Sequence, residues 1–241
     1  MKAIIFAAGL GTRISRHIGD KPKCLVEVYG VPLILYTINL LMKNGIHDIA
    51  VVTGYKAEQI ERILPRNVHV FRNPFFSVSN SIASLWFARD FISGSSPVLA
   101  MNGDVFIEDD ILNELFHTEQ GDNLALMVAD SSRIEEADYK FSWKDGHLET
   151  FGKQLTPPET TGEYVGLGLV YPEYVNKLLR IVEREIMNGN YNQWWEEPIY
   201  KQTLLGQNVG VLDISGCFWV ELDFAEDLGR LNQYINTLLS G

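Results

Sequence analysis

Short apolar runs alternate with amphipathic segments through the first half of the chain. The apolar runs at residues 4–8, 48–53, 68–71 and 98–101 have the length of strands. Between them, residues 32–43 place apolar side chains at helical spacing, and shorter helices are expected at 57–64 and from residue 79 or 80 to about 91. Alternation of strands and helices in this way predicts a parallel sheet with crossover helices.

The pattern changes in the second half. A helix is expected at 109–117 and a strand at 124–129, after which two alternating runs, 139–143 and 147–151, flank a Lys-Asp-Gly turn. Asp-Gly between two such runs predicts an antiparallel hairpin. The remaining expected elements are a strand at 162–170, a helix at 172–187, strands at 209–214 and 217–222, and a helix at 224–239. We therefore expect an α/β fold: a Rossmann-like mixed, mostly parallel sheet flanked by helices, with a small partly antiparallel lobe.

The composition limits the kinds of partner and the cellular compartment that are expected for this chain. The chain has 241 residues, 46% of them hydrophobic, which fits one α/β domain. A formal net charge of −11 argues against a nucleic-acid partner or an anionic membrane. Cys24 and Cys217 are too few for a disulfide framework and have no metal-type spacing, so a reducing cytoplasm is expected. The apolar N-terminus is interrupted by glycines and Arg13, unlike a signal peptide, and no run approaches the length of a membrane span.

The first candidate site follows the N-terminal apolar run. Gly9 and Gly11 allow positive φ and a close approach of the backbone to a ligand. Successive N–H groups in such a turn form an anion site, and Arg13 and Lys23 add charges suited to phosphate oxygens. The loop has neither the Gly-Lys-[Ser/Thr] of a Walker A sequence nor the third glycine of the dinucleotide fingerprint. On spacing alone, an ordinary turn and a triphosphate-binding loop are both open.

A candidate metal ligand follows the fourth expected strand. Asp104 lies in an Asn-Gly-Asp sequence directly after that strand. Open α/β sheets bind ligands at the carboxyl ends of their strands, and Mg²⁺ is commonly held by one or two carboxylates together with substrate phosphates. The alternative is an aspartate in a solvated turn.

Several of these stretches resemble a known family. The Ala-Ala-Gly-Leu-Gly-Thr-Arg sequence at 7–13, followed by Lys-Pro-Lys at 21–23, resembles the signature of nucleotidyltransferases that make nucleotide-activated sugars and alcohols. Further matches at 102–104 and at 221–223 (Glu-Leu-Asp) extend the resemblance over nearly the whole chain. It implies an enzyme that binds a nucleoside triphosphate.

The resemblance also implies roles for individual residues. Arg13 and Lys23 would be the catalytic cations, and Asp104 and Asp223 would hold Mg²⁺. Asp227 is interpreted as structural, because an acid in the first turn of a helix is favoured by the macrodipole in any case. The nucleotide would be bound by residues of the loop, of the strand end and of a segment that holds the base: Ala8, Gly9, Gly11, Thr12, Asn80, Ser84 and Asp104.

The base-binding segment has a simpler interpretation as well. Ser79 or Asn80 is able to cap the helix that follows, and a helix N-terminus that faces the phosphate loop would supply base or phosphate contacts. A plain N-cap is the alternative for either residue.

Two tryptophans beside two acids suggest where an acceptor binds. Trp194 and Trp195 precede Glu196 and Glu197, and aromatic faces with carboxylates can form a cage for a cationic ligand. A core or an oligomer contact is the alternative, and adjacent helical positions point about 100° apart, so at most one tryptophan should face a ligand. Glu163 joins this acceptor set because the resemblance places a Gly-Glu stretch beside the acceptor.

The chain looks most like bacterial phosphocholine and aminoalkylphosphonate cytidylyltransferases. This resemblance implies transfer of a cytidylyl group from CTP to phosphocholine or 2-aminoethylphosphonate, with release of pyrophosphate. A sugar-1-phosphate or inositol-1-phosphate acceptor is the alternative, for which Glu163 and Asn192 would supply hydrogen bonds. A non-catalytic regulator that binds nucleotide-sugars, and a glycosyltransferase, are further alternatives. The presence of Lys23 with both metal aspartates, and the lack of an Asp-x-Asp after the fourth strand, speak against them.

The expected organisation is a single domain over residues 1–241. Its nucleotide-binding half spans about 1–130, its acceptor-binding part about 131–223, and a helix covers 224–241. A homodimer is compatible with the sequence, with Phe75, Phe76 or Trp194 at the contact.

Overall fold

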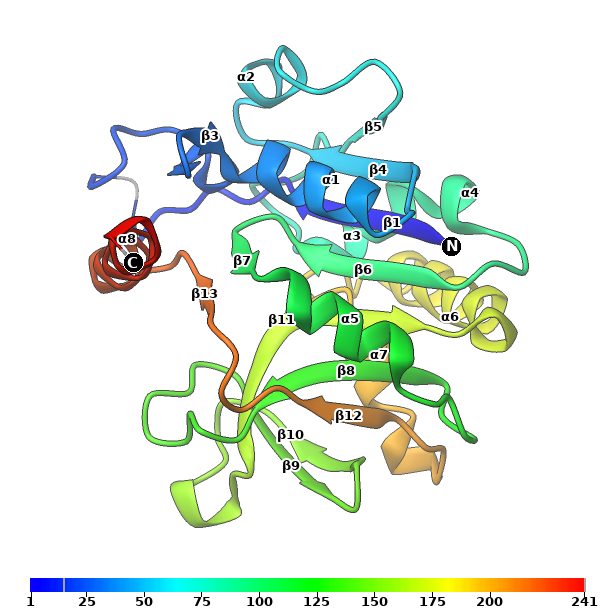
Figure 1. The fold of residues 1–241 in the computed structure, drawn as a ribbon. Helices are drawn as coiled ribbons and strands as arrows, with labels where there is room; N and C mark the ends of the chain where they lie inside the picture. The colour runs from blue at the N-terminus through cyan, green and yellow to red at the C-terminus, as the bar shows by residue number, and fades with distance from the viewer. Residues whose placement is uncertain (15, 241) are drawn as a thin grey trace.

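A long mixed sheet forms the centre of the molecule in the computed structural model, which describes residues 1–14 and 16–240 (Figure 1). Its strands are β1 (Lys2–Ala7), β4 (Asp48–Thr53), β5 (His69–Arg72), β6 (Val98–Asn102), β8 (Ala125–Asp130), β9 (Lys140–Lys144), β10 (His147–Phe151), β11 (Gly162–Val170) and β12 (Gly210–Asp213). They lie in the order β5-β4-β1-β6-β11-β8-β12-β10-β9.

Helices cover both faces of this sheet. The described helices are α1 (Leu33–Lys43), α2 (Ala57–Glu61), α3 (Ser81–Phe87), α4 (Arg89–Ile92), α5 (Asp109–His117), α6 (Pro172–Met187), α7 (Glu197–Tyr200) and α8 (Ala225–Ser240), with short 3-10 helices η1 (Lys23–Leu25), η2 (Pro157–Glu159) and η3 (Thr203–Leu205). Of these, α8 packs against Phe106 and Val220 of the smaller β7–β13 sheet. In Figure 1, α1 and α5 lie in front of the sheet, and α3 and α6 lie behind it.

The central strand β1 shows why the core has two layers. Ala3 and Ile5 pack into the cluster that holds α1, α2 and α5, whereas Ile4 and Phe6 pack into the cluster that holds α3, α6 and α7. Successive side chains of a strand point to opposite faces, so a strand that is apolar at every position must be covered on both sides. The uninterrupted apolar run that begins the sequence has this environment.

The sheet changes direction at β11. Strands β5, β4, β1 and β6 are parallel to one another, but β11 runs antiparallel to both β6 and β8. Every residue of β11 is buried, and its pairing with β8 shifts register between Tyr164 and Gly168, where Gly166 has φ 87°. The β9–β10 hairpin turns at Asp145 and Gly146, which have φ of 51° and 77°. These are the left-handed values that Asp-Gly favours in a two-residue turn.

The last strand leaves the main sheet. β13 (Trp219–Glu221) pairs antiparallel with β7 (Val105–Ile107). The N–H of Leu222 then donates to the carbonyl of Asp104 over 3.0 Å. This small sheet therefore brings the segments after β6 and after β13 together, although more than a hundred residues separate them in the sequence.

The structure confirms the predicted fold class and refines several elements. The helix expected over 79–91 is divided into α3 and α4, and α2 ends at Glu61. The strand expected at 217–222 is β13, which lies outside the main sheet. The strands that the pattern did not predict are β7 and the hairpin of β2 (Glu27–Val28) and β3 (Val31–Pro32). Each is only two or three residues long, too short to show a period in the sequence.

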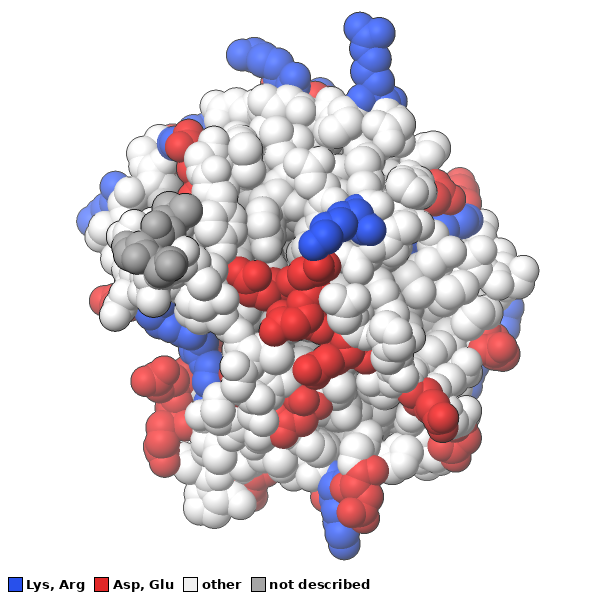
Figure 2. Space-filling view, viewed as in Figure 1, with Lys and Arg blue, Asp and Glu red and all other residues white. Residues whose placement is uncertain are grey.

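The surface reflects the acidic composition. Figure 2 shows Asp and Glu side chains gathered over the middle of one face, around α5 and β13, with Lys and Arg mainly toward its edges. In the part of the chain that the structure describes, no helix combines the length and the apolar character needed to cross a bilayer.

Candidate active site

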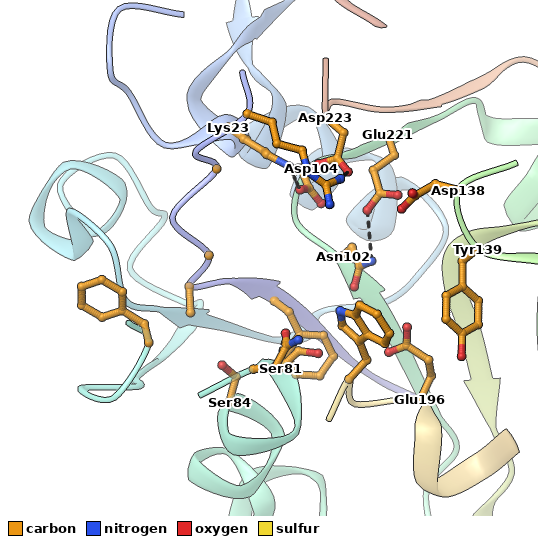
Figure 3. A pocket seen from close by; sticks show the side chains of 18 of the residues that line it. Lys23, Ser81, Ser84, Asn102, Asp104, Asp138, Tyr139, Glu196, Glu221 and Asp223 are labelled. Atoms are coloured by element: carbon orange, nitrogen blue, oxygen red, sulfur yellow. Dashed lines mark hydrogen bonds and ion pairs between the residues drawn. The ribbon is translucent and has the colours of Figure 1, made fainter. Parts of the chain in front are cut away.

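A cavity of about 320 Å³ opens where β1, β6 and β13 end. Figure 3 shows Lys23, Asp104, Asp223 and Glu221 on one side of it, Tyr139 and Glu196 on another, and Asn102 between them. The lining residues come from the N-terminal loop, the segment before and within α3, the strands and their ends, and the loops next to β9, β10 and α7: Phe6, Ala8, Gly9, Gly11, Thr12, Arg13, Lys23, Asn73, Phe76, Ser79, Asn80, Ser81, Ser84, Asn102, Asp104, Asp138, Tyr139, Lys153, Tyr164, Trp194, Glu196, Glu221 and Asp223.

The loop after β1, which was predicted to bind a triphosphate, borders the cavity, and its two glycines differ. Gly11 has φ 60°, and a Cβ there would lie 2.9 Å from Cγ of Lys23. Gly9 does not have a positive φ, and a Cβ there would meet no atom within 4 Å. The requirement for glycine is therefore physical at Gly11, where the backbone is left-handed and Lys23 passes close by.

Lys23 lies between the two aspartates that were predicted to hold metal. Its Nζ is 2.9 Å from Oδ2 of Asp104 and also forms an ion pair with Oδ1 of Asp223. Burial by itself would lower the pKa of the Lys23 ammonium, but the charges of Asp104 and Asp223 outweigh it and hold that pKa above its usual value. Lys23 is thus a largely buried cation that is paired with two carboxylates in the wall of the cavity.

Arg13 lies at the mouth of the same cluster. Its Nη1 is 2.9 Å from Oδ2 of Asp223, and its guanidinium stands 5.4 Å from the ring centroid of Phe224. Half of the Arg13 side chain is exposed, so the guanidinium is accessible to an incoming anion. Asp227 accepts hydrogen bonds from the N–H groups of Asp223 and Phe224, which agrees with the structural role that the sequence suggested for it.

Glu221 adds a third carboxylate to this end of the cavity. Burial, and then the charges of Asp104 and Asp223, raise the pKa of Glu221 well above its usual value. Asn102 donates from Nδ2 to Glu221 over 3.4 Å and accepts from the indole Nε1 of Trp195 over 3.1 Å. Sequence reasoning quoted both residues in motifs but gave neither a role. The signal was their position at the ends of β6 and β13, beside the two predicted aspartates.

The donor set at this end fits a divalent cation. Among the described residues, no three or more His, Cys, Asp or Glu side chains converge as a ready-made metal site. Asp104 and Asp223 nevertheless direct carboxylate oxygens at one point, because both contact the same ammonium of Lys23. Two carboxylates are the usual protein share of a Mg²⁺ site that takes its other ligands from phosphates and water.

The segment predicted to hold the base lies on the opposite wall. Oδ1 of Asn80 accepts from the N–H of Ser81, and the buried Ser84 accepts at Oγ from Nδ2 of Asn73 over 3.1 Å. The N–H groups of Ile82 and Ala83 are also engaged, by the carbonyls of Gln193 and Asn80. The expectation that this helix N-terminus binds phosphate is therefore not supported, since its first donors already have protein partners. Base contacts from Asn80 and Ser84 stay a prediction.

Trp194 and Glu196 line the far end of the cavity. The ring of Trp194 meets that of Tyr139 edge-on, with centroids 5.4 Å apart. Glu196 is 4% exposed, and within the described residues no hydrogen-bond partner reaches its Oε2. Burial raises the pKa of Glu196 to about 8, and the charge of Glu197 adds to the shift. Aromatic faces and a buried carboxyl with a free oxygen thus lie together, as a cage for a cation requires.

Lys153 and Asp138 complete this end, and sequence reasoning missed both. Lys153 Nζ is 2.7 Å from Oδ2 of Asp138 and 5.6 Å from the ring centroid of Trp194. Both residues lie on irregular segments next to β9 and β10, where no motif or period marks them. Only the folded chain brings them to the cavity.

Three residues of the predicted acceptor set do not line the cavity. Trp195 has no exposed surface, stacks on Phe6 with ring centroids 5.5 Å apart, and donates its backbone N–H to Ser81 Oγ. It belongs to the core, and the expectation that at most one tryptophan faces a ligand agrees with this position. Asn102 takes its indole N–H, so Trp195 supports the cavity wall from behind.

Glu197 and Glu163 are occupied by protein partners. Glu197 accepts from the N–H of Trp194 over 3.0 Å and forms an ion pair with Lys201. Glu163 is 5% exposed and is held by Arg133 Nε and by the N–H of Asp138, both at 2.7 Å. Glu163 therefore fixes the backbone at Asp138, and the prediction of direct acceptor contacts from Trp195, Glu197 and Glu163 is corrected accordingly.

The aromatic residues proposed for a dimer contact lie in different environments. Phe75 is 58% exposed, whereas Phe76 and Trp194 line the cavity. Phe75 is therefore the most exposed of the three, Phe76 and Trp194 are half-buried, and a homodimer stays a prediction.

Comparison with known proteins gives a consistent group of relatives. A family model described as the MobA-like NTP transferase domain matches residues 3–188. The chain is 27% identical over 254 residues to CTP:phosphoglutamine cytidylyltransferase of Campylobacter jejuni, covering 95% of this chain and 98% of that protein. It is 37% identical over 217 residues to 2-aminoethylphosphonate cytidylyltransferase of Lancefieldella rimae, covering 88% and 82%.

A solved structure has the same fold. The structure of CTP:phosphocholine cytidylyltransferase from Streptococcus pneumoniae matches with a TM-score of 0.77 at 21% identity, over 97% of this chain and 98% of that one. At this identity the likeness concerns the fold, and it agrees with the mixed sheet and flanking helices described above.

Proposed function

The chain belongs to the family of MobA-like NTP transferase domains and is a nucleotidyltransferase, and we propose that it transfers a cytidylyl group from CTP to a small phosphate or phosphonate that carries an amine or a quaternary ammonium. One observation carries the choice of acceptor. The cavity joins a cluster of cations and carboxylates at one end to a buried, half-satisfied carboxyl among aromatic rings at the other. Phosphocholine and 2-aminoethylphosphonate have matching halves, an anion and a cation. The names of the relatives support CTP as the donor.

The bonds change at the α-phosphorus. An anionic oxygen of the acceptor attacks it, the bond from the α-phosphorus to the bridging oxygen breaks, and pyrophosphate leaves. The attacking oxygen is already deprotonated, so the protein needs no general base. Its contribution is to position two anions and to offset their repulsion, the main requirement in phosphoryl transfer.

Each cation of the cluster has a separate task in this proposal. Arg13 and the amides of the loop from Ala8 to Thr12 bind the β- and γ-phosphates. Lys23 leaves its aspartates and lies across the α-phosphate and the incoming acceptor oxygen. Asn80 and Ser84 contact the base from the opposite wall.

Members of this family generally use a divalent metal ion, and we propose Mg²⁺ bound by Asp104 and Asp223. When bound, Mg²⁺ supplies charge neutralisation at the phosphate oxygens. The carboxylates that Lys23 now occupies become free for this role when the lysine turns toward the phosphates.

The proposal is tested by pyrophosphate release over a grid of substrates with Mg²⁺. One axis holds the four ribonucleoside triphosphates and dTTP, and the other holds phosphocholine, 2-aminoethylphosphonate, glucose-1-phosphate and inositol-1-phosphate. Release with CTP and an amine-bearing acceptor is expected. Release only with a sugar phosphate or inositol phosphate would still support nucleotidyl transfer but would reject the proposal of a cationic acceptor. Nucleotide binding without release for any pair would instead favour a regulator.

A further inference from the structure

Lys153 places its own ammonium at the end of the cavity that is lined by Tyr139, Trp194 and Glu196, the acceptor end of the proposed function. It lies between β10 and η2, and its side chain lines the cavity together with those of Asp138 and Trp194. Its Nζ is 2.7 Å from Asp138 Oδ2 and 5.6 Å from the centre of the Trp194 ring. A carboxylate and an aromatic face are the two contacts that an ammonium ligand would seek there.

A similar pairing of a lysine with groups that would bind a cation occurs at the end of the cavity where Lys23 lies. Lys23 holds two carboxylates that fit a cation, and Lys153 holds a carboxylate and a ring that fit a cation. Among the described residues that line the cavity, Arg13, Lys23 and Lys153 are the lysines and arginines. Of these, Lys153 alone contacts the acceptor end, so it is the charge that an incoming ammonium must meet.

The charges around Lys153 favour displacement over permanent pairing. Its side chain is 42% exposed and that of Asp138 is 46% exposed, so their ion pair is in contact with water and is weak. In the described part of the chain, no hydrogen-bond partner reaches Oε2 of the buried Glu196, and the ion pair of Lys153 is with Asp138 instead. A small cation would therefore find in Glu196 a buried partner that Lys153 does not satisfy.

We propose that Lys153 is a specificity-determining residue that occupies the acceptor's ammonium position in the free protein and is displaced when a cationic acceptor binds. The inference rests on the proposed function for the identity of the ligand. Competition by Lys153 excludes acceptors without a positive charge, because a neutral group gains nothing from Asp138 or Glu196 that would offset the loss of the lysine contacts. Cationic acceptors bind despite Lys153, and they would bind more tightly without it.

The test measures binding of the cationic part of the acceptor without its phosphate, so the result does not depend on catalysis. Choline and its neutral isostere 3,3-dimethyl-1-butanol are titrated at constant ionic strength and followed by tryptophan fluorescence and calorimetry. The variants are Lys153→Met and Lys153→Arg, with Lys144→Met as a matched control, since Lys144 is an exposed lysine at the end of the same hairpin. Removal of an exposed ion pair should tighten choline binding by about three- to fivefold in Lys153→Met.

The other outcomes are equally defined. Lys153→Arg and Lys144→Met should bind choline and the neutral isostere as the wild type does, whereas Lys153→Met should also bind the neutral isostere more tightly, because the lysine that excluded it is gone. Unchanged or weaker choline binding in Lys153→Met, with an unchanged Tm, would overturn the inference.

A kinetic arm separates this inference from the proposed function. In Lys153→Met, the KM for 2-aminoethylphosphonate should fall while the KM for CTP stays constant. Tighter choline binding with no transfer to any amine acceptor would leave Lys153 in its role and reject the proposed function. Normal transfer by the wild type with no effect of Lys153→Met would reject the inference alone.

Discussion

The two ends of the cavity hold acids in contact with lysines, but they are built from different kinds of structure. At the end lined by Lys23, where the proposed function puts the phosphates, Asp104 and Asp223 each lie two residues after a strand (β6 and β13), and the side chain of Lys23 is only 14% exposed. At the acceptor end, Asp138 and Lys153 lie on loops, and the side chain of Lys153 is three times as exposed, at 42%. Under the proposed function, the residues that bind the phosphates are therefore held at the ends of strands, whereas the residues that select the acceptor lie on loops, whose sequence can change without disturbing the sheet.

The largest effect should come from the phosphate end. Asp104→Asn keeps the size of the side chain but removes one of two carboxylates that fit Mg²⁺, and Lys23→Ala removes the cation between the two reacting anions. Each should lower kcat by about 10²-fold or more, the scale of losing one preorganised charge. Steady-state kinetics with CTP and 2-aminoethylphosphonate provide the measurement.

The control is a surface aspartate. Asp90→Asn changes a side chain that is 90% exposed and should retain wild-type turnover. If Asp104→Asn or Lys23→Ala also retained it, the role given to that residue would be rejected. A change in acceptor preference in either variant would contradict the claim that one end of the cavity handles the phosphates and the other selects the acceptor.

A smaller, pH-dependent effect should come from Glu196. A raised pKa of about 8 means that Glu196 is mostly neutral at pH 6 and becomes ionised as the pH rises through 8. A cation prefers the ionised form, so the Kd for choline should fall roughly tenfold per pH unit up to about pH 8 and then level off. Fluorescence titrations from pH 6 to pH 9 measure this dependence.

Glu196→Gln tests the cause of that dependence. The amide cannot ionise, so the variant should bind choline about 10- to 100-fold more weakly at pH 8, with no slope against pH. Glu183→Gln, on the exposed face of α6, should behave as the wild type. A slope that survives in Glu196→Gln would assign the titration to another group.

The two adjacent tryptophans should give opposite phenotypes. Trp194→Leu removes an aromatic face at the cavity and should weaken choline binding by about 2- to 30-fold with little change in Tm. Trp195→Ala empties a buried site and should lower the free energy of unfolding by about 3–5 kcal/mol. For a chain of this size, that is a fall in Tm of roughly 10 °C.

Thermal melts and choline titrations of both variants make this comparison. The account requires the binding defect and the stability defect to fall on different residues. Equal loss of stability in Trp194→Leu would place that ring in the core, and the cage would have to be abandoned.

Several residues named from the sequence lie together for a physical reason. Glycine turns and strand ends leave local signals at Gly11, Lys23 and Asp104, the family resemblance added Asp223, and all four line one cavity. That they bind phosphate and metal stays a prediction. The main elements were also predictable, since β4, α5 and α6 have the expected bounds. Long periodic segments carry most of this information.

The acceptor end was less predictable because contact there depends on tertiary structure. Glu163 and Glu196 are both buried acids, but Arg133 forms an ion pair with the first, whereas among the described residues no hydrogen-bond partner reaches Oε2 of the second. Nothing local distinguishes them. Lys153 and Asp138 flank the two strands of the predicted hairpin, and its register, with Phe141 opposite Phe151, brings them close to each other. The sequence does not show that Trp194 packs beside this pair, because that contact joins segments far apart in the chain.

The most direct test of the two-ended site compares acceptors that differ only in the cation. With CTP and Mg²⁺ at pH 8, kcat/KM is measured for 2-aminoethylphosphonate and for ethylphosphonate, which keeps the phosphonate and lacks the amine. The account predicts a preference of about tenfold or more for the amine-bearing acceptor, because only this acceptor gives the buried oxygen of Glu196 a charged partner. Equal values, or a preference for ethylphosphonate, would contradict the claim that this end of the cavity recognises a cation.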